Sequence, residues 1–258
     1  MPNITATARL QRIMTLVRDR EELKAGDLSR ELGVTPMTVW RDFKLLAEQG
    51  LLRRVRGGVQ MLGGAVSEPD FESKTTTSTK AKARIAVAAA KEFVSEGDVV
   101  ALEGGTTVAA LVNALPEQRI SVITNSLPIA LRMRAQRPAL PVRVIGGWLS
   151  AVSGNTTGPE AAKAAEMGHI SVCFLGATGW DEEYGPMDPN PLEIEVKRAL
   201  AAASNQVVLL MDSQKFHTRS VSVMIHPRRI HALVTDAPPP DAVMKRLQAA
   251  GVRVLIAM

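Results

Sequence analysis

The sequence predicts an α/β protein of two domains, an N-terminal winged helix-turn-helix followed by a larger, largely parallel α/β domain. Three observations support this fold class. A capped helix with a basic outer face and a glycine-linked hairpin lie within the first 62 residues. From residue 80, short apolar strands alternate with helices. A polar segment rich in Ser and Thr separates the two patterns. We therefore expect domains at residues 1–62 and 80–258, joined by a linker at 63–79.

The first domain is expected to contain three helices and a hairpin. Apolar periodicity and turn residues place these elements at residues 6–20, 25–32, 36–49, 51–55 and 59–62. Thr35 can cap the third helix, and Pro36 suits its first turn. Gly57 and Gly58 separate the two strands, which is a hairpin signal. This order of elements is typical of a winged helix-turn-helix.

The third helix has a polar and basic face that a hydrophobic core does not need. In a winged helix-turn-helix this helix enters the major groove of double-stranded DNA, where base edges can be distinguished. Arginines on the hairpin can hold the adjacent phosphates. The expected DNA contacts are Thr35, Met37, Thr38, Trp40, Arg41 and Lys44 on the helix, with Arg53, Arg54 and Arg56 on the hairpin. The alternative is a small helical bundle with a basic surface.

The distribution of charge agrees with a DNA-binding head. Residues 1–62 hold 11 Lys and Arg against 7 Asp and Glu, whereas the remaining 196 residues hold 20 against 19. The basic excess therefore lies in the first quarter of the chain, although a solvated surface would look similar. The single cysteine, Cys173, fits a reducing cytoplasm, and no apolar run is long enough for a membrane span.

The second domain shows repeated alternation between strand and helix. Strands are expected at residues 98–102, 120–124, 142–145, 170–175, 206–211, 231–235 and 252–256. Helices are expected at residues 81–93, 107–114, 127–135, 160–167, 192–203 and 241–250. Continuous apolar strands joined by helices favour a parallel sheet that is covered on both faces.

Small polar residues follow four of the predicted strands. Ligands of such sheets bind beyond the carboxyl ends of the strands. The residues expected to bind a ligand there are Glu103, Gly104, Gly105, Thr106 and Thr107, then Thr124, Asn125 and Ser126, then Gly146 and Gly147, and finally Asp212 and Lys215. One such turn is weak evidence, but four together predict a small, polar, phosphorylated ligand.

The residue types suggest how that ligand would be held. The two glycines at 104–105 let backbone approach an anion, and Thr106 and Thr107 add hydroxyl donors before a helix. Glu103 and Asp212 can accept hydrogen bonds from sugar or polyol hydroxyls, and Lys215 can pair with phosphate. Residues 154–158 are expected to form a flexible loop over this site. Neither a nucleotide-binding motif nor metal-ligand spacing is present, so we expect no cofactor and no metal.

The residues resemble those of the DeoR family of bacterial transcriptional repressors. Residues 34–43 (VTPMTVWRDF) are similar to the family's recognition helix, and residues 48–54 with Gly57-Gly58 are similar to its wing. Trp40 stands where the family usually has the first of two arginines. Residues 105–107, 124–126, 146–147, 193–198, 212–216 and 235–236 are similar to motifs of its effector domain. Glu103 stands where the family usually has aspartate.

The resemblance carries several expectations. It implies an effector domain with the fold of ribose-5-phosphate isomerase, and it adds Glu193 to the effector-binding residues. It also implies a cytoplasmic repressor that is not an enzyme. This repressor would bind operator DNA as a homo-oligomer, dimer or tetramer, and a phosphorylated sugar or polyol would release it. Residues 235–240 (TDAPPP) are similar to the glycerol-3-phosphate-responsive branch.

Two other functions use the same residues. A sugar-phosphate isomerase could employ Glu103, Asp212 or Glu193 as base and Lys215 as an electrostatic stabiliser, but it gains nothing from a DNA-binding head. A constitutive DNA-binding or architectural protein does not explain the four polar strand ends on an otherwise apolar sheet.

Overall fold

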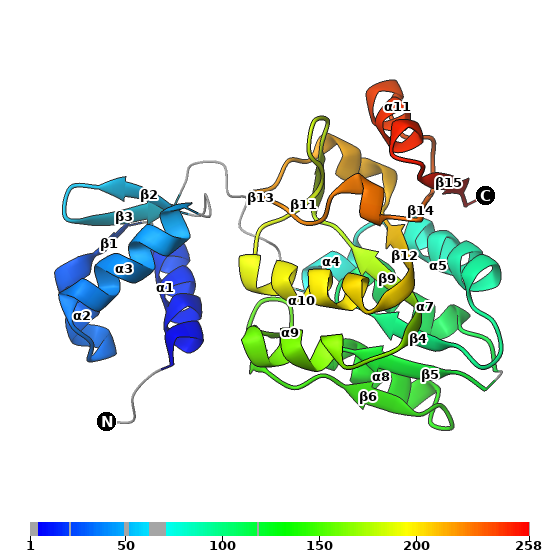
Figure 1. The fold of residues 1–258 in the computed structure, drawn as a ribbon, viewed down its shortest axis with the longest axis horizontal. Coiled ribbons are helices and arrows are strands. Elements are labelled where there is room, and N and C mark those ends of the chain that lie inside the picture. The colour runs from blue at the N-terminus through cyan, green and yellow to red at the C-terminus, as the bar shows by residue number, and fades with distance from the viewer. Residues whose placement is uncertain (1–4, 21, 49–51, 62–70, 118, 258) are drawn as a thin grey trace. The chain divides into compact units, whose positions relative to one another are not determined.

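The computed structural model describes residues 5–20, 22–48, 52–61, 71–117 and 119–257. The chain divides into two compact units between residues 68 and 69 (Figure 1). Each unit is described by itself below. Within the described residues, no helix combines the length and the apolar character that a membrane span needs.

The first unit is a winged helix-turn-helix. Its elements are α1 (Ala6–Arg20), β1 (Glu22–Lys24), α2 (Ala25–Leu32), α3 (Pro36–Glu48), β2 (Leu52–Val55) and β3 (Gly58–Met61). Ile13, Val39 and Phe43 are buried without exposed surface and form the centre of its core. β2 and β3 pair as the predicted hairpin. β1 was not predicted, because it is only three residues long and is defined by its antiparallel pairing with β3.

The segment expected to be a linker contains regular structure. A short helix, α4 (Phe71–Thr76), lies within it, and α5 (Thr79–Phe93) begins at its end. Phe71 is buried, and its N–H donates to the carbonyl of Val152 at 3.3 Å. Residues 71–79 therefore belong to the second unit. The part of the expected linker at 63–70 lies outside the described residues.

The second unit is organised around a sheet whose described strands all run parallel. Its strands are β4 (Val99–Leu102), β5 (Ser121–Thr124), β6 (Val142–Val144), β9 (Ile170–Gly176), β12 (Ser204–Leu210), β14 (Ala232–Thr235) and β15 (Arg253–Ile256). Their spatial order is β15-β14-β12-β9-β4-β5-β6. Each of these strands overlaps one that the sequence predicts, so the predicted parallel sheet is confirmed.

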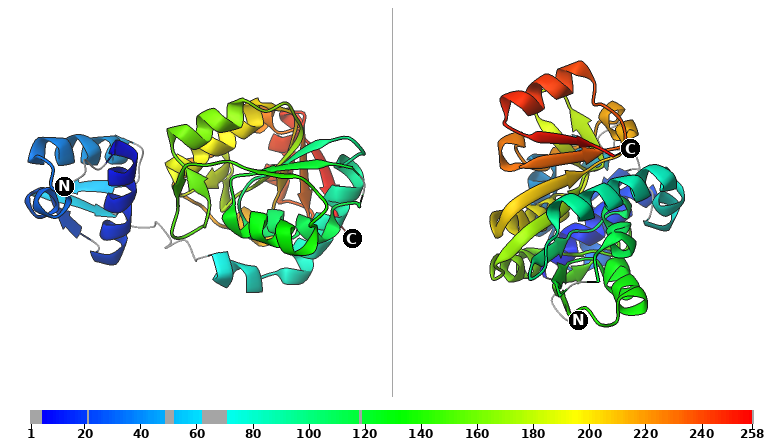
Figure 2. Two further views of the ribbon diagram at one scale, coloured as in Figure 1. Left: turned by 90° about the horizontal axis from the view of Figure 1, so that it is seen from below. Right: turned by 90° about the vertical axis from the view of Figure 1, so that its right-hand side faces the viewer.

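Helices cover both faces of this sheet (Figures 1 and 2). One face packs against α5, α6 (Thr106–Ala109), α7 (Leu111–Ala114) and α8 (Leu127–Gln136). The other packs against α9 (Pro159–Glu166), α10 (Pro191–Ala202) and α11 (Asp241–Ala249). Along β4, Val100 and Leu102 face the first layer and Ala101 faces the second. Strands buried on both faces explain the continuous apolar runs in the sequence.

Three features differ from the expected elements. The helix expected at 107–114 is divided into α6 and α7 at Ala110. Two small antiparallel sheets were not predicted. One contains β7 (Trp148–Leu149) and β8 (Thr156–Thr157), and the other contains β10 (Gly179–Asp181), β11 (Gly185–Asp188) and β13 (Ser222–Val223). These strands have two to four residues, which is too short for a periodic pattern.

Candidate functional site

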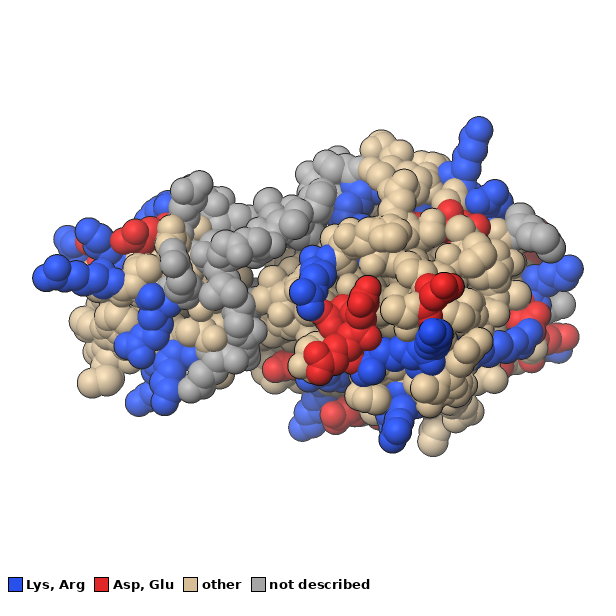
Figure 3. Space-filling view, turned by 90° about the horizontal axis from the view of Figure 1, so that it is seen from above, with Lys and Arg blue, Asp and Glu red and all other residues tan. Residues whose placement is uncertain are grey.

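The recognition helix of the first unit presents the predicted basic face. Met37 is 72% exposed, and Arg41 and Lys44 are exposed beside it. On the wing, Arg54 and Arg56 are exposed, whereas the side chain of Arg53 lies outside the described part of the structure. In the view of Figure 3, most of the charged side chains visible on this unit are basic. This face matches what phosphate and base contacts require.

Four of the predicted DNA contacts also interact with one another within the unit, as the pairs Thr35–Thr38 and Trp40–Arg54. The Thr35 hydroxyl caps α3 by accepting a hydrogen bond from the N–H of Thr38 at 3.2 Å, as predicted. The two hydroxyls also lie 2.9 Å apart. Trp40 is half-buried, packs edge-on against Phe43, and lies with its ring centroid 5.3 Å from the Arg54 guanidinium. Trp40 therefore joins the recognition helix to the wing.

A buried ion pair fixes the recognition helix from behind. Asp42 of α3 is 5% exposed, and its Oδ1 accepts a hydrogen bond from Arg9 Nη2 of α1 at 3.0 Å. Asp42 points inward while Arg41 is exposed. The two neighbouring charged residues therefore differ in role. Asp42 holds α3 against α1, whereas Arg41 is exposed and free to face DNA.

In the second unit, the order of the strands defines where a ligand can bind. The chain proceeds outward from β4 to β5 and β6, then returns to place β9 on the other side of β4. This reversal makes the carboxyl ends of β4 and β9 the topological switch point, where ligands bind in open parallel sheets. Glu103 follows β4 there, and Gly176 ends β9.

A buried charge cluster occupies the switch point. Lys197 of α10 lies with its Nζ 3.1 Å from Glu103 Oε2 and 2.8 Å from Asp188 Oδ2, and it donates to the carbonyl of Gly176 at 3.0 Å. All three charged side chains are nearly inaccessible. Burial raises the pKa of Glu103 to about 8, despite the opposing charge of Lys197. Burial opposes the charge on Lys197, but Asp188 and Glu103 raise its pKa.

Glu193 extends this cluster toward the segment at residues 150–158. Its carboxylate accepts hydrogen bonds from Ser153 Oγ at 2.8 Å, Asn155 Nδ2 at 3.1 Å and Asn190 Nδ2 at 3.1 Å. Asn155 is 2% exposed and lies against Gly104, where a Cβ would come within 2.0 Å of its side chain. The segment expected to be a loop at 154–158 instead contains the short strand β8 (Thr156–Thr157), and Asn155 within it is buried.

Several buried side-chain oxygens at this edge lack partners, and three of them lie around the ends of β4 and β5. Glu103 Oε1, Asn125 Oδ1 and Asn155 Oδ1 are buried and accept no hydrogen bond from any described residue. Buried acceptors are almost always satisfied, so such a group calls for a donor. Asn125 Nδ2 donates to the carbonyl of Thr156, and the N–H of Thr156 donates to the carbonyl of Asn125. The neighbouring residues Ser126 and Asn155 form an antiparallel β-bridge. The arrangement can receive hydroxyl groups of a small ligand.

Other predicted residues hold the local backbone. Thr124 Oγ1 donates to the carbonyl of Leu102 at 2.6 Å, and Ser126 Oγ caps α8 by accepting from the N–H of Ile129. Gly105 has φ +120°, a conformation that favours glycine, and it precedes α6, which begins with Thr106. Thr106 and Thr107 are half-buried. Gly146 and Gly147 follow β6 at the outer edge of the sheet, separated from β4 by β5.

Asp212 and Lys215 belong to a second cluster. Asp212 follows β12 and is 2% exposed, and Lys215 lies in the short 3₁₀ helix η1 (Ser213–His217). Lys82 of α5 and Lys215 both favour the charge of Asp212, although burial raises its pKa. β9 separates β12 from β4, so the two clusters are roughly 10 Å apart, two strand spacings.

The sequence did not predict four residues of these clusters. Asp188, Asn155, Lys197 and Lys82 are all buried and all contact or face predicted site residues. Lys197 and Lys82 had a detectable signal, because each falls on the apolar face of its helix, three residues before a buried leucine or isoleucine. Asp188 and Asn155 lie in short irregular segments that carry no comparable signal.

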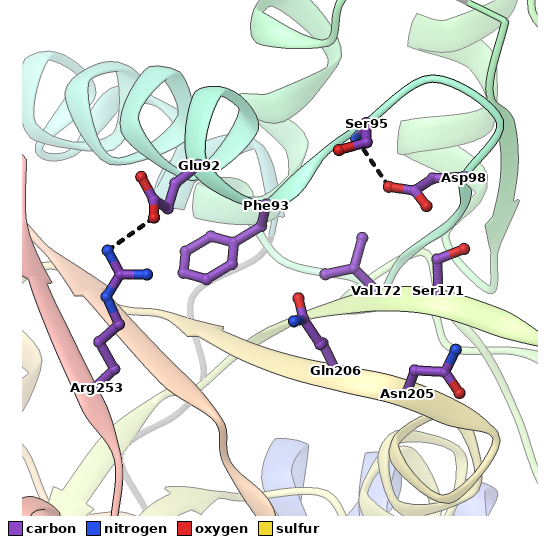
Figure 4. Close-up of a pocket in the computed structure, with 9 residues that line it drawn as sticks. All are labelled: Glu92, Phe93, Ser95, Asp98, Ser171, Val172, Asn205, Gln206 and Arg253. Atoms are coloured by element: carbon purple, nitrogen blue, oxygen red, sulfur yellow. Dashed lines mark hydrogen bonds and ion pairs between the residues drawn. The ribbon is translucent and has the colours of Figure 1, made fainter.

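A separate polar pocket lies at the opposite, amino edge of the sheet (Figure 4). It is lined by the end of α5 and the starts of β9, β12 and β15. Arg253 is paired with Glu92 at 2.7 Å, and the Asp98 carboxylate accepts from the N–H of Ser95 at 2.8 Å. The unpartnered buried acceptors described above lie at the carboxyl edge instead. The carboxyl edge is therefore the stronger candidate for the effector site.

Comparison with known proteins agrees with both units. Residues 9–63 match the model of the DeoR-like helix-turn-helix domain, and residues 77–237 match that of the DeoR C terminal sensor domain. An HTH-type transcriptional regulator of Bacillus subtilis, YulB, is 30% identical over 95% of both chains. The glycerol-3-phosphate regulon repressor of Escherichia coli is 28% identical over 93% of this chain and 95% of its own.

Among solved structures, ribose 5-phosphate isomerase A of Methanocaldococcus jannaschii is similar at 18% identity and a TM-score of 0.40, over 54% of this chain and 55% of its own. The family models cover the two units in chain order, and the relatives match over nearly their whole length. The chain therefore belongs to the DeoR family of DNA-binding transcriptional regulators.

Proposed function

We propose that this regulator is a repressor of carbohydrate or polyol catabolism genes, and that a phosphorylated sugar or polyol releases it from its operator. The observation that carries the proposal is the set of buried acceptors without partners at the carboxyl edge of the sheet, on Glu103, Asn125 and Asn155. Hydroxyl groups of a sugar or polyol supply the missing donors. The similarity to the glycerol-3-phosphate regulon repressor makes glycerol-3-phosphate the first compound to test.

The second cluster supports the phosphate part of this proposal. Lys215 and Lys82 supply positive charge beside Asp212, and Thr106 and Thr107 supply hydroxyl donors at the end of β4. A separation of roughly 10 Å between the clusters suits a ligand with hydroxyls at one end and phosphate at the other. Such a ligand can release the protein from DNA only if it binds the released state more tightly than the DNA-binding state. The binding free energies of the two states must differ by about a few kcal/mol.

The proposed release mechanism requires that two or more DNA-binding units bind the operator together. We propose a homo-oligomer, dimer or tetramer, whose heads occupy spaced half-sites on double-stranded DNA in the cytoplasm. We also propose that the sensor site binds its ligand without converting it, because Glu103 Oε2 is already engaged by Lys197. Incubation with ribose-5-phosphate, followed by quantification of ribulose-5-phosphate, tests this, since sustained turnover would establish the isomerase alternative instead.

The test of induction is an operator titration at fixed salt. The DNA is the promoter region beside the gene, and the candidate effectors are glycerol-3-phosphate and a set of sugar phosphates, each paired with its unphosphorylated form. Fixed salt is needed because phosphate contacts dominate the affinity for DNA. We expect one phosphorylated compound to weaken operator binding. Thr106→Val should retain operator binding and respond less. If no phosphorylated compound alters operator affinity, the proposed induction is wrong.

A further inference from the structure

Three carboxyl groups and one lysine are buried together at the carboxyl end of β4. Glu103 is 0% exposed, Asp188 is 3% exposed, and Glu193 and Lys197 are each 4% exposed. Burial raises the pKa of Glu103 to about 8. The nearby charges of Asp188 and Glu193 add to that rise, whereas Lys197 opposes it. With one ammonium among three carboxyl groups, the cluster can stabilise a further positive charge.

The ammonium of Lys197 has no hydrogen-bond donor left for such a purpose. An ammonium group carries three N–H bonds. Those of Lys197 serve Glu103 Oε2 at 3.1 Å, Asp188 Oδ2 at 2.8 Å and the carbonyl of Gly176 at 3.0 Å. Glu103 Oε1 is buried and has no hydrogen-bond partner among the described residues. A donor for this oxygen therefore has to come from outside the cluster.

Two amide oxygens beside the cluster are in the same position. Asn155 Oδ1 and Asn125 Oδ1 are also buried without a hydrogen-bond partner among the described residues. Asn155 lies against Gly104, the residue that follows Glu103, and its Nδ2 donates to Glu193 at 3.1 Å. Asn125 follows β5, the strand beside β4. The unpartnered oxygens and the surplus of carboxyl groups thus lie in one region.

The chemistry of these groups distinguishes between two possible donors on a ligand. A hydroxyl brings one donor, but its own oxygen carries lone pairs that carboxylate and amide oxygens repel. The unpartnered side-chain atoms of this region are all acceptors, so they cannot satisfy those lone pairs. A protonated amino group brings three donors, no lone pair, and a positive charge for the surplus carboxyl groups. It therefore suits this region better than a hydroxyl of similar size.

We propose that the effector is a phosphorylated amino sugar, whose protonated amino group binds between Glu103, Glu193 and Asn155. The inference rests on the proposed function and names the class of its ligand. Asn125 Oδ1 accepts a hydrogen bond from a hydroxyl of the same sugar. An amino sugar and its parent sugar have nearly the same shape, so the site distinguishes them by charge and by the number of donors.

The test measures binding to the full chain by calorimetry at pH 7. The compounds are glucosamine-6-phosphate, glucose-6-phosphate and N-acetylglucosamine-6-phosphate, which share ring and phosphate and differ in the group on one ring carbon. Galactosamine-6-phosphate and galactose-6-phosphate repeat the comparison in the other ring configuration. In one of these configurations we expect the amine to bind about 10- to 100-fold more tightly than the parent sugar phosphate, the effect of one charged hydrogen bond. The uncharged N-acetyl form should bind more weakly than the amine.

Two variants of α10 test where the amino group binds. Glu193→Gln keeps the shape of the side chain and removes its charge, and Glu195→Gln does the same at an exposed position of the same helix. We expect Glu193→Gln to reduce the preference for the amine by about tenfold or more, and Glu195→Gln to keep the wild-type preference. The preference compares two ligands on one protein, so a smaller folded fraction in a variant does not change it.

The outcomes separate this inference from the proposed function. If the wild type binds the parent sugar phosphates as tightly as the amines, or binds only phosphate esters that lack an amino group, the amino-sugar class is wrong and the proposed function stands. If the amine is preferred and Glu193→Gln keeps that preference, the amino group does not bind beside Glu193. If the wild type binds no phosphorylated compound, the proposed effector class fails, and this inference fails with it.

Discussion

Lys197 of α10 lies with its Nζ 3.1 Å from Oε2 of Glu103, and both side chains are buried at the carboxyl end of β4. The pair joins a helix on one face of the sheet to β4, which lies beside the central strand β9. Asp188 binds the same ammonium at 2.8 Å. Removing the Lys197 ammonium would leave the buried carboxyl groups of Glu103 and Asp188 without their shared cation.

Lys197→Met should destabilise the sensor unit by about 3–5 kcal/mol, because breaking a buried ion pair leaves the partner charge uncompensated. Thermal unfolding of the full chain measures the effect. Lys163→Met on the exposed face of α9 is the control, and it should change stability by less than about 0.5 kcal/mol. A stable Lys197→Met protein would mean that the Asp188 carboxyl, like that of Glu103, is protonated once the ammonium is removed.

Gly104→Ala should weaken ligand binding more than Gly146→Ala, although both glycines follow predicted strands. A Cβ at Gly104 would come within 2.0 Å of the Asn155 side chain, whereas a Cβ at Gly146 meets no atom within 4 Å. Asn155 would have to leave Glu193, which costs about 1–3 kcal/mol for the unsatisfied buried groups. Calorimetry with glycerol-3-phosphate or the best ester found compares the two variants. Equal affinities would exclude Asn155 from the site.

Much of this fold could be predicted because the information is local. The apolar runs predict the strands of the sheet. The polar residues that follow these strands predict that Glu103, Gly104 and Asn125 lie at one edge. The winged helix-turn-helix also follows from local caps, turns and periodicity, and Thr35 caps α3 as expected.

The partners of those residues could not be predicted in the same way. Lys197 reaches Glu103, 94 positions earlier in the chain, only because β9 lies beside β4 in the sheet. Asn155 lies in a polar segment whose composition favours a loop, and its burial depends on Gly104 and Glu193, which are remote in sequence. Lys82 and Lys197 show that a lysine on an apolar helix face deserves a search for buried carboxylates.

Asp42→Ala should destabilise the DNA-binding unit by about 2 kcal/mol or more, since it leaves the largely buried guanidinium of Arg9 without its carboxylate. The ion pair between Arg30 and Asp27 is the control. Both of its side chains are mostly exposed, so Asp27→Ala should cost about 1 kcal/mol or less. Unfolding monitored by tryptophan fluorescence, with Trp40 on α3 as a reporter, measures both variants. Equal effects would show that Asp42 does not position the recognition helix.

Arg41→Ala should reduce operator affinity by about 1–3 kcal/mol if Arg41 contacts a base, without changing ligand binding in the sensor unit. Arg41 is exposed on α3, so its removal should leave the stability of the unit within about 0.5 kcal/mol. Operator titrations at several salt concentrations give the measurement. A uniform loss on all DNA sequences, with a shallower salt dependence, would assign Arg41 to a phosphate instead. Unchanged affinity would remove it from the interface.

Binding of a phosphate ester should weaken as the pH rises above about 8. The pKa of Lys82 is lowered to about 8 by burial, so its ammonium is present below that pH and is lost above it. Asp212, Lys215 and Lys74 surround the group, and Asp212 alone favours its charge. If the bound state requires the proton, affinity falls by up to about tenfold per pH unit above the pKa. Calorimetry between pH 6.5 and 9.5 follows this decline.

Lys82→Met separates the contribution of Lys82 from that of Glu103, whose pKa is raised to about 8 and which therefore titrates in the same range. Glu103 gains negative charge as the pH rises, so it also opposes an anionic ligand, and any slope that remains in Lys82→Met belongs to it. Glu103→Gln should remove that remainder and keep the part due to Lys82. A wild-type affinity that stays constant from pH 7 to 9.5 would show that neither group changes charge in contact with the ligand.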